Sequence, residues 1–571
     1  MLKDYFEVPN KPAIKSGNIL SCDFTDHETF IPQPLDYTRG TIATYVDCNG
    51  FIKMSGVSDT NLVTNGTFET PVDSNQWLNF GSPLIAERSQ TVAYEGSFSY
   101  HIKGDSTNDG TQATATQFTG DYVIGDTIRV RAYIYPITAS SNQIKSGVAN
   151  SNRSITTAVG GLVLNQWNFI EYYAEITTAS NNYVTFLISG TAGEFYLDNV
   201  SVNKVDVETP RIDYLTEIGK AKELQKPSLL LEPQRTNLAI YSQDILQWPA
   251  FEGTRTANTA ISPENIQNAG SFVENTANSR HRLNTNYISY TSGSTYTFTL
   301  FAKIKSGSRL LCINANSAFN ARAYFNLVDG SIAGTDSGTA NIEAYPNDWY
   351  RCSVTGTATS TSSMTTFFGL EDSPSDNGYQ GDGTSGHFYY GLQIEQGSYP
   401  TSLIHTSGSA VTRNQDLANN AGQLGVFNDT EGVLYAEMAS LANDGTQRKL
   451  AISDGTNQNV VVLQFTNVTN QLRAFLYNGA LNVNMYNVLS NALEFNKIAF
   501  KFKENDFSLY VNGSEVATDP SGTTFSTGDL TKFNFNDGGI SDPFHARIRE
   551  IKVFRRALTD SELTELTNNI V

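Results

Sequence analysis

Short segments in which apolar and polar residues alternate recur along this chain of 571 residues. Residues 128–135 (IRVRAYIY) and 168–176 (NFIEYYAEI) show the pattern clearly. Successive side chains of a β-strand point to opposite faces of its sheet, so alternation at a period of two predicts strands with one buried face. Gly, Ser, Thr and Asn are plentiful, which is typical of short strands joined by tight turns. The pattern predicts an all-β protein.

Two local signals near the ends of the chain predict specific elements. Residues 41–46 and 51–54 flank the pair Asn49-Gly50, where both positions tolerate positive φ, and so predict a hairpin. Near the C-terminus, Thr559 and Glu562 are three residues apart at the start of a short helical segment. This spacing predicts a capping box, in which each residue satisfies a backbone N–H of the other.

Residues 229–231 are three consecutive leucines and are followed by Pro233, which has no N–H to give to a ladder. A short apolar run of this kind predicts one buried strand. Residues 210–214 predict another strand just ahead of it. We expect the rest of the chain to be arranged around residues 209–238.

Composition narrows the class of protein. At roughly 100–200 residues per domain, several domains are expected. The net charge of −19 argues against a nucleic-acid partner, because phosphate binding needs clustered Lys and Arg. No run of about 18 apolar residues predicts a membrane-spanning helix, so no membrane insertion is expected. The start of the chain lacks the apolar core of a secretion signal. Four cysteines do not make a disulfide scaffold, and we expect reduced structural thiols.

Three landmarks occur twice in the same order, which indicates two copies of one sandwich. The first copy carries NLVTNGTFETPVDSNQW (61–77), LNQWNFIEYYAEIT (164–177) and EFYLDNVSVNK (194–204). The second carries NLAIYSQDILQW (237–248), YPNDWYRCSVTGTA (345–358) and HFYYGLQIEQG (387–397). Trp167 and Trp349 take equivalent places in the repeat, which favours a packing role for both.

The segments LDYTRGTIATYVDCNGFIKM (35–54), SLLLEPQRTNL (228–238) and GDGTSGHFYYGLQIEQGSYPTSLIHTSGSAVTRNQD (381–416) resemble bacteriophage virion proteins, the fibres and spikes of tails or heads. In those proteins a hairpin like 41–54 passes within a few residues into a PRIDY-like strand. Here that strand begins only at Pro210. The resemblance therefore implies an insertion of about 150 residues at a loop, where domain insertion is tolerated.

Two further resemblances concern the sandwiches. NGTFE (65–69) and YLDNVSV (196–202) resemble the marks of carbohydrate-binding modules of the jelly-roll type. The late hairpin with YVNG (510–513) and the terminal helix resemble laminin-G and concanavalin-A-like jelly rolls. The fold expected is all-β: a small N-terminal β module with an inserted jelly roll, then a second jelly roll and a concanavalin-A-like sandwich. The expected boundaries are 1–59 with 209–235, 60–208, 236–412 and 413–571.

No catalytic motif was found, and no catalytic residue is predicted. There is no HExxH, P-loop, G-x-S-x-G or paired CxxC. A glycosidase on a concanavalin-like fold would need two nearby carboxylates. The third sandwich has no E-x-D-x-E, and the same-face neighbours of Glu437 are Tyr435 and Ala439. Acids supplied by separate strands leave a polysaccharide depolymerase open as an alternative.

Three groups of residues are candidates for binding. The module resemblance implies that Glu69 and Asp198 hold a structural calcium ion; the alternative is that both are ordinary surface or turn residues. Sugar binding needs flat aromatic faces, and Tyr133 and Tyr135 share one face of their strand. Trp77 is a further aromatic candidate, and the alternative for all three is the core. The loop 373–385 offers candidates of its own, for an ion or a ligand, against a plain surface connection: Asp376, Tyr379 and Asp382.

The resemblance to phage proteins implies a function. It predicts a virion structural protein, a tail or head fibre, spike or decoration component, that displays sandwiches to host-surface glycans. It also implies other virion proteins as partners, the virion as location, and a homotrimer, although no long heptad run is visible. A purely architectural capsid-decoration protein without glycan affinity is a second alternative.

Overall fold

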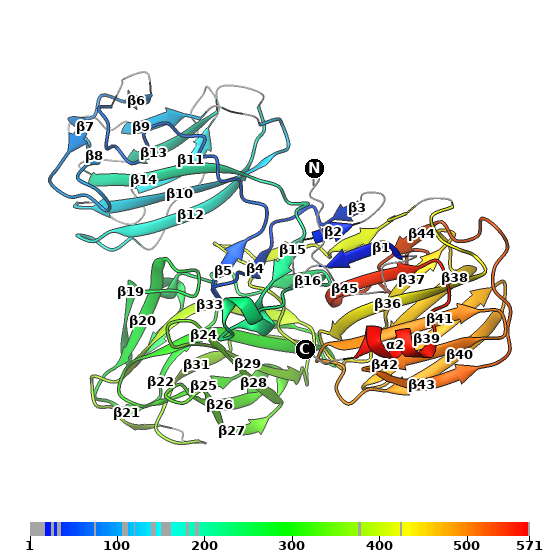
Figure 1. Ribbon diagram of the computed structural model, residues 1–571. Helices are drawn as coiled ribbons and strands as arrows, with labels where there is room; N and C mark the ends of the chain where they lie inside the picture. The colour runs from blue at the N-terminus through cyan, green and yellow to red at the C-terminus, as the bar shows by residue number, and fades with distance from the viewer. Residues whose placement is uncertain are drawn as a thin grey trace.

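The computed structural model describes residues 18–23, 28–30, 36–72, 76–105, 112–118, 120, 122–138, 144–149, 162–178, 182–188, 193–374, 378–422 and 425–568. Over these residues the chain forms three two-layered β-sandwiches that meet around a central junction (Figure 1). The all-β prediction is confirmed. No helix in the described part is long and apolar enough to cross a membrane.

The first sandwich, here called the insert, packs a five-stranded sheet on a four-stranded one, with its core between them. The five-stranded sheet runs in the order β12 (Asn168–Glu175), β10 (Thr127–Pro136), β14 (Glu194–Val205), β8 (Ser99–Lys103) and β7 (Ile85–Ser89). The four-stranded sheet runs β11 (Ile144–Ala149), β13 (Tyr183–Ile188), β9 (Gln112–Gln117) and β6 (Trp77–Phe80).

The second sandwich has two six-stranded sheets. One runs β18 (Ala250–Phe251), β22 (His281–Asn284), β31 (Phe367–Glu371), β25 (Leu310–Asn314), β26 (Arg322–Asn326) and β27 (Ser331–Ser337). The other runs β19 (Gly253–Ile261), β20 (Gln267–Glu274), β33 (Gly386–Gln396), β24 (Thr295–Ser306), β29 (Trp349–Thr357) and β28 (Thr339–Tyr345).

Short elements complete the second sandwich and its connections. They are β17 (Arg235–Asn237) with β34 (Val411–Arg413), β21 (Asn278–Ser279) with β32 (Tyr379–Gln380), β23 (Ile288–Tyr290) with β30 (Ser362–Met364), the 3-10 turn η3 (Ile245–Gln247) and the one-turn helix α1 (Asn316–Phe319).

The third sandwich packs a nine-stranded sheet on a five-stranded one. The nine-stranded sheet has the path β15 (Arg211–Asp213), β16 (Ser228–Leu230), β45 (Ala546–Phe554), β36 (Glu431–Ser440), β41 (Asn496–Lys503), β42 (Phe507–Val511) and β43 (Ser514–Asp519), with β1 (Asn18–Asp23) and β2 (Glu28–Phe30) beside it. The other sheet runs β40 (Leu481–Val488), β39 (Gln471–Asn478), β38 (Asn459–Phe465), β37 (Arg448–Ser453) and β44 (Lys532–Asn534).

The terminal helix α2 (Asp560–Thr567) lies against the outer face of the nine-stranded sheet (Figure 1). The predicted capping box is confirmed, because the Thr559 hydroxyl accepts from the Glu562 N–H and the Glu562 carboxylate accepts from the Thr559 N–H at 2.8 Å. Arg556 also donates to Glu562 at 2.6 Å. The C-terminal helix is therefore fixed at its first turn.

The leucine run is a buried strand, as predicted, and residues 211–213 form its antiparallel neighbour. The other neighbour lies far along the chain: Leu229 is opposite Ile548 of β45. Leu229 and Leu231 are both 1 % exposed and belong to the core of the third sandwich. The segment expected in a small N-terminal module thus completes the sheet of the C-terminal sandwich.

The N-terminal hairpin, β4 (Thr44–Val46) with β5 (Ile52–Met54), lies elsewhere. Val46 and Ile52 pack onto the outer face of the second sandwich. The Tyr214 N–H donates to the Val46 carbonyl at 2.9 Å, which joins the hairpin to the chain just after β15. Among the described residues, 36–59 and 209–235 therefore touch each other but share no sheet of their own.

The first and last residues of the insert are neighbours where they join the rest of the chain. The Asp206 N–H donates to the Gly56 carbonyl at 2.8 Å, and Val57 bridges Val205. The insert also docks sideways on the second sandwich. There His405 pairs with Glu264 at 2.6 Å and lies 3.9 Å from Glu171 of β12. The two ends of the insert therefore lie next to each other.

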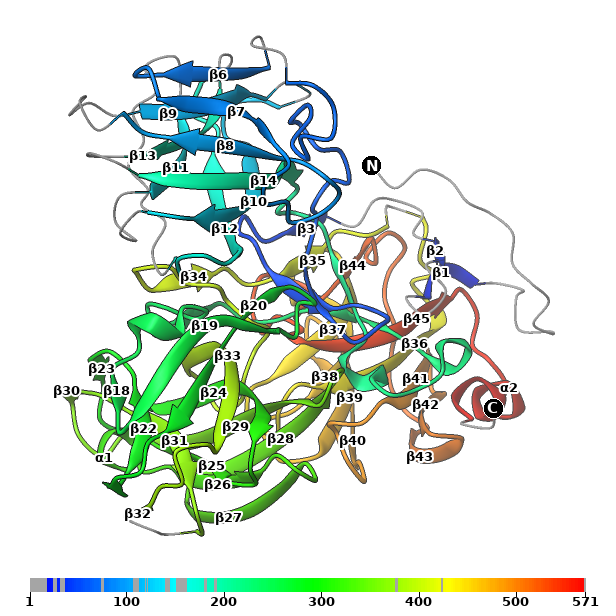
Figure 2. The same ribbon diagram turned by 90° about the vertical axis from the view of Figure 1, so that its left-hand side faces the viewer.

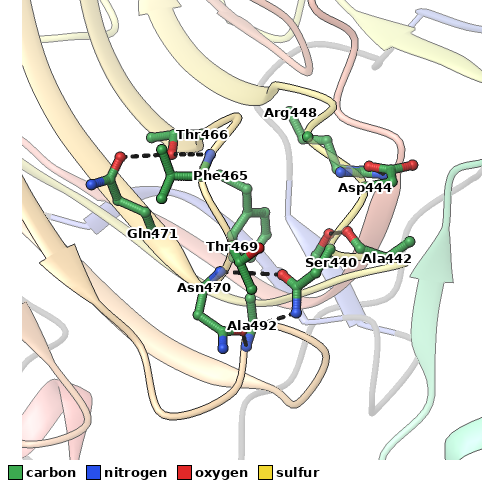
Figure 3. Close-up of a pocket in the computed structure, with 13 residues that line it drawn as sticks. Ser440, Ala442, Asp444, Arg448, Phe465, Thr466, Thr469, Asn470, Gln471 and Ala492 are labelled. Atoms are coloured by element: carbon green, nitrogen blue, oxygen red, sulfur yellow. Dashed lines mark hydrogen bonds and ion pairs between the residues drawn. The ribbon is translucent and has the colours of Figure 1, made fainter.

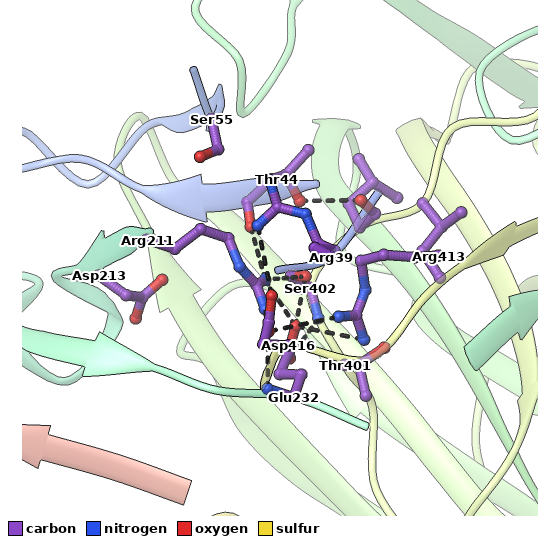
Figure 4. Close-up of polar contacts among 12 residues, drawn as sticks. Arg39, Thr44, Ser55, Arg211, Asp213, Glu232, Thr401, Ser402, Arg413 and Asp416 are labelled. Atoms are coloured by element: carbon purple, nitrogen blue, oxygen red, sulfur yellow. Dashed lines mark hydrogen bonds and ion pairs between the residues drawn. The ribbon is translucent and has the colours of Figure 1, made fainter. Parts of the chain in front are cut away.

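A buried polar cluster joins segments that are hundreds of residues apart (Figure 4). Arg211 ion-pairs with Glu232 at 2.7 Å and with Asp416, and its side chain is fully buried. Arg39 lies 3.3 Å from Asp416, and Arg413 lies 3.4 Å from Glu232. Burial raises the pKa of both carboxyls, but the arginine charges outweigh it, so the pKa of Glu232 lies well below its usual range and that of Asp416 is lowered. Both acids are therefore ionised and neutralised within the cluster.

Three cysteines with described side chains, Cys48, Cys312 and Cys352, are free thiols. Burial raises the pKa of Cys312 to about 12 and that of Cys352 well above its usual value. Thiols of this kind are poor nucleophiles, because the thiolate is the reactive form. They act as small apolar side chains in the second sandwich.

Candidate functional site

The outer face of the five-stranded sheet of the insert carries a row of aromatic side chains. Along β10, every second residue from Ile128 to Ile134 points into the core, and Tyr133 and Tyr135 point outward. The prediction that these two tyrosines share a face is confirmed. Trp167, in the turn before β12, lies edge-on to Tyr135 with ring centroids 5.5 Å apart. The alternation of one strand thus aligns the middle of the row.

The row extends in both directions across neighbouring segments. Tyr94 stacks on Tyr133 with ring centroids 3.5 Å apart and lies edge-on to Trp167 at 5.9 Å. On β14, Tyr196 lies 6.3 Å from Tyr135. His101 of β8 stacks on Tyr196 at 4.3 Å. Six rings from five segments therefore form one contiguous surface.

Polar groups border this surface. The Glu194 carboxylate binds the His101 ring at 2.8 Å and the Lys103 ammonium at 2.9 Å. Burial raises the pKa of Glu194, but the hydrogen bonds from Lys103 and His101 outweigh it and leave that pKa lowered. Burial, together with the hydroxyl of Tyr94, raises the pKa of Tyr133 above its usual range. The tyrosine hydroxyl stays neutral and a carboxylate stays ionised at physiological pH.

This combination has a definite chemistry. Aromatic rings pack against the C–H faces of a sugar ring, and the adjacent carboxylate, ammonium and hydroxyl groups match sugar hydroxyls as acceptors and donors. Trp167 is partly exposed and Tyr94 is 36 % exposed, so both rings are accessible to a ligand. The surface suits a carbohydrate better than a wholly apolar ligand, because charged groups lie at its edge.

The equivalent face of the second sandwich is closed. There Phe301, Trp349 and Tyr390 lie under Val46 and Ile52 of the N-terminal hairpin. Trp349, the counterpart of Trp167, is 1 % exposed and donates its indole N–H to the Ile261 carbonyl at 2.9 Å. The two sandwiches therefore differ on this face: the second holds the hairpin there, and the insert leaves Trp167 and Tyr94 at least partly exposed beside its contact with His405 at Glu171.

The structure corrects the prediction for Trp77 as a ligand platform. Trp77 is 1 % exposed and packs against Phe68, Tyr100 and Phe186 in the core of the insert. Its position on β6 turns the indole toward the opposite sheet. The aromatic row instead uses Trp167, Tyr94, Tyr196 and His101. Tyr94 and Trp167 lie outside strands, so strand alternation gave no signal for them.

The glycine-rich loop of the second sandwich is held together by its own polar groups. Tyr379 is 7 % exposed, donates to Glu274 and lies under the guanidinium of Arg309. The Asp382 carboxylate accepts from the N–H groups of Thr384 (2.6 Å) and Ser385 (2.7 Å). Hydrogen bonds from Ser385, ahead of those from Thr384, hold the pKa of Asp382 well below its usual value. Both residues serve the loop itself, and Asp376 lies outside the described residues.

The predicted cation ligands, Glu69 and Asp198, come together beside the loop 94–98. One oxygen of Glu69 accepts from the N–H groups of Ser97 and Phe98, each at 2.9 Å. Asp198 accepts from Tyr94 and Asn199. Burial, with the charge of Glu69 added, raises the pKa of Asp198 to about 6.

Neither Glu69 nor Asp198 has an ion-pair partner among the described residues. Two carboxylates that lie together without an ion-pair partner can bind a hard metal cation, provided that carbonyl oxygens supply further ligands. No group of three or more His, Cys, Asp or Glu suited to a metal occurs in the described part. Backbone oxygens would therefore have to complete the site.

Two cavities lie elsewhere in the described part of the chain. A small pocket lies at one end of the third sandwich, between Asp444 and Asn470 (Figure 3). Its volume is about 10 Å³, which is room for about one water molecule. A larger polar hollow of about 340 Å³ lies between the hairpin turn at Asp47 and the loop 214–225. Across β36 and β45, Glu437 lies opposite Glu550, but each is ion-paired, Glu437 to Arg549 at 3.3 Å and Glu550 to Lys552.

Comparison with known proteins gives one family match. Residues 434–564 match the concanavalin A-like lectin/glucanases superfamily (laminin G type), so the C-terminal sandwich is a concanavalin A-like domain, as expected. No curated protein matches the chain.

Solved structures resemble the chain only distantly. The carbohydrate-binding module of Ruminococcus gnavus IT-sialidase bound to α2,3-sialyllactose is 21% identical, covering 26% of this chain and 93% of that one, with a TM-score of 0.22. The tandem module of Paenibacillus barcinonensis Xyn10C is 13% identical (60% and 98% covered, TM-score 0.22). Trypanosoma rangeli sialidase is 10% identical (94% and 99% covered, TM-score 0.21). Scores this low carry no argument about function.

Proposed function

We propose that this protein is an adhesion protein that binds glycans through the aromatic row on the insert. The observation that carries the proposal is the exposed row itself, Tyr94, Tyr133, Tyr135 and Trp167, with charged groups at its edge. A contiguous group of accessible aromatic rings with charged groups at its edge is typical of a binding surface. The closed face of the second sandwich supports the assignment to the insert.

A glycan array tests this proposal with the full chain. We expect binding to one or a few glycans, reduced at least about tenfold in Trp167→Ala, because a stacked aromatic contact is worth about 1.4 kcal/mol or more. Tyr486→Ala is the matched control, since that tyrosine is exposed on the third sandwich. A blank array, or equal loss in both variants, contradicts the proposal.

We further propose that the protein is a bacteriophage virion component, a tail or head fibre, spike or decoration protein. It would form a homotrimer and attach to other virion proteins. The support is the resemblance of residues 35–54, 228–238 and 381–416. Each of these segments contributes at least one residue to the buried polar cluster, among them Arg39, Glu232 and Asp416. Electron microscopy of particles labelled with an antibody to the insert would locate the protein. Absence from purified particles contradicts this part alone.

Calcium is proposed as a structural ion at Glu69 and Asp198. It would neutralise both carboxylates and tie the loop 94–98 to the end of β14. The expected result is a higher melting temperature of the insert in calcium than in chelator, with no such difference in Asp198→Asn. Equal melting of the wild-type protein in both buffers contradicts it.

A further inference from the structure

A second unusual surface lies on the six-stranded sheet of the second sandwich that begins with β18. Both views place this sheet on the side of the sandwich away from the insert, with β22 and β31 next to each other (Figures 1 and 2). Its outer face carries Arg282 between two phenylalanine rings. The guanidinium carbon lies 5.0 Å from the centre of the Phe251 ring and 4.7 Å from that of Phe367.

Strand register builds this arrangement. Phe251 lies directly opposite Arg282 across β18 and β22, and Asn284 lies opposite Phe367 across β22 and β31. Arg282 and Asn284 are two residues apart on one strand, so they point to the same face. Phe251 is 44 % exposed, so its ring is accessible to a ligand. The surface therefore combines a cation, two rings and an amide.

Arg282 has no counter-charge in the described part of the chain. No ion pair or hydrogen bond of its guanidinium is found there, and its Nε is buried without a partner. The Oδ1 of Asn284 is likewise buried without a partner. Burial lowers the pKa of Arg282, and the charge of Arg280 lowers it further. The net charge of the protein is −19, yet Arg282 has no compensating acid among the described residues.

We propose that this surface, centred on Arg282, binds the carboxylate of an acidic sugar, a uronate or sialate unit of an anionic polysaccharide. The rings cover the faces of the guanidinium and leave its in-plane N–H groups for the two oxygens of a carboxylate, a bidentate geometry that arginine favours. The exposed ring of Phe251 contacts the C–H face of the same sugar.

The proposal goes beyond the function proposed above, because it assigns an anion site to a different sandwich. The test is calorimetric titration of the full chain at low salt with oligogalacturonate, its fully methyl-esterified form, and oligosialate. All titrations use the Trp167→Ala background, so that the insert row does not contribute. If no acidic oligosaccharide binds, the proposal for Arg282 fails and the proposal for the aromatic row is unaffected. If the glycan array is blank, the proposal for Arg282 can still be tested.

We expect one of the two acidic oligosaccharides to bind, and the methyl ester to bind at least about tenfold more weakly, as loss of one charge-assisted hydrogen bond predicts. Arg282→Gln should weaken binding by the same factor, and Phe251→Ala should weaken it to a smaller degree. Arg473→Gln is the matched control, because Arg473 also lies over two rings, Phe475 and Tyr486, but donates to Asn484 at 2.7 Å. Binding should be unchanged in this variant.

Three results would overturn the proposal. The first is that neither acidic oligosaccharide binds. The second is that Arg282→Gln and Arg473→Gln lose affinity equally, which would indicate general charge attraction. The third is that poly-glutamate binds as well as the oligosaccharides, which would assign the surface to an acidic peptide.

Discussion

Truncating Leu229 to alanine should loosen a sandwich whose own sequence starts two hundred residues later. Leu229 is 1 % exposed and packs in the core of the C-terminal sandwich, opposite Ile548. The truncation removes about three methylene equivalents, or about 2.4 kcal/mol at about 0.8 kcal/mol each. A residual cavity adds to this, within the range of about 2–5 kcal/mol measured for such substitutions.

Hydrogen–deuterium exchange resolved by segment is the right assay, because a chain of several sandwiches does not unfold in one step. At about 1.4 kcal/mol per factor of ten, a loss of 2.4 kcal/mol corresponds to about fifty-fold faster exchange. We expect that acceleration in β45 and β36, with the second sandwich unaffected. Leu224→Ala is the control, since Leu224 is 64 % exposed on the same connecting segment.

Two outcomes would show that Leu229 does not stabilise the third sandwich. If exchange in β45 stays as slow as in the wild-type protein, Leu229 does not belong to that core. If the acceleration is confined to residues 209–235, the leucine strand is a module of its own that only touches the third sandwich.

Three further predictions concern charge and capping. Arg211→Met should destabilise the junction by about 3–5 kcal/mol, seen as a lower denaturant midpoint, because it leaves two buried carboxylates short of a partner. In chelator, the insert should melt at a lower temperature at pH 7.5 than at pH 5. The raised pKa of Asp198, about 6, means that the folded state binds this proton more tightly than the unfolded state, so stability falls as pH rises through 6. That slope should be absent in Asp198→Asn. Thr559→Ala should cost about 1 kcal/mol and speed amide exchange in the first turn of α2 only.

Local signals in the sequence were sufficient for elements whose partners are near in the chain. The turn at Asn49-Gly50 predicts the hairpin β4–β5, and the spacing of Thr559 and Glu562 predicts the cap of α2. Alternation predicts which side chains of β10 share a face. In each case the deciding interaction spans a few residues, so the sequence around it is informative.

Long-range neighbours could not be predicted in this way. The leucine run predicts a buried strand, but the sequence around it does not indicate that β45 lies next to it. Trp167 and Trp349 are equivalent in the repeat, yet one is covered by the hairpin and the other is partly exposed. Trp77 was misassigned for the same reason, because an isolated aromatic residue does not reveal which layer covers it. Sites on sheet faces depend on what packs over them, which is decided by the whole fold.

Tryptophan fluorescence can show whether a glycan lies on the aromatic row of the insert. The chain has four tryptophans, and three of them, Trp77, Trp248 and Trp349, are each 1 % exposed. Acrylamide quenching of the native protein therefore reports on Trp167. With a glycan selected from the array, we expect that saturation protects this tryptophan from acrylamide, and that Trp167→Phe shows little quenching with or without the glycan. If a glycan binds while quenching of Trp167 stays unchanged, the aromatic row is not the binding surface.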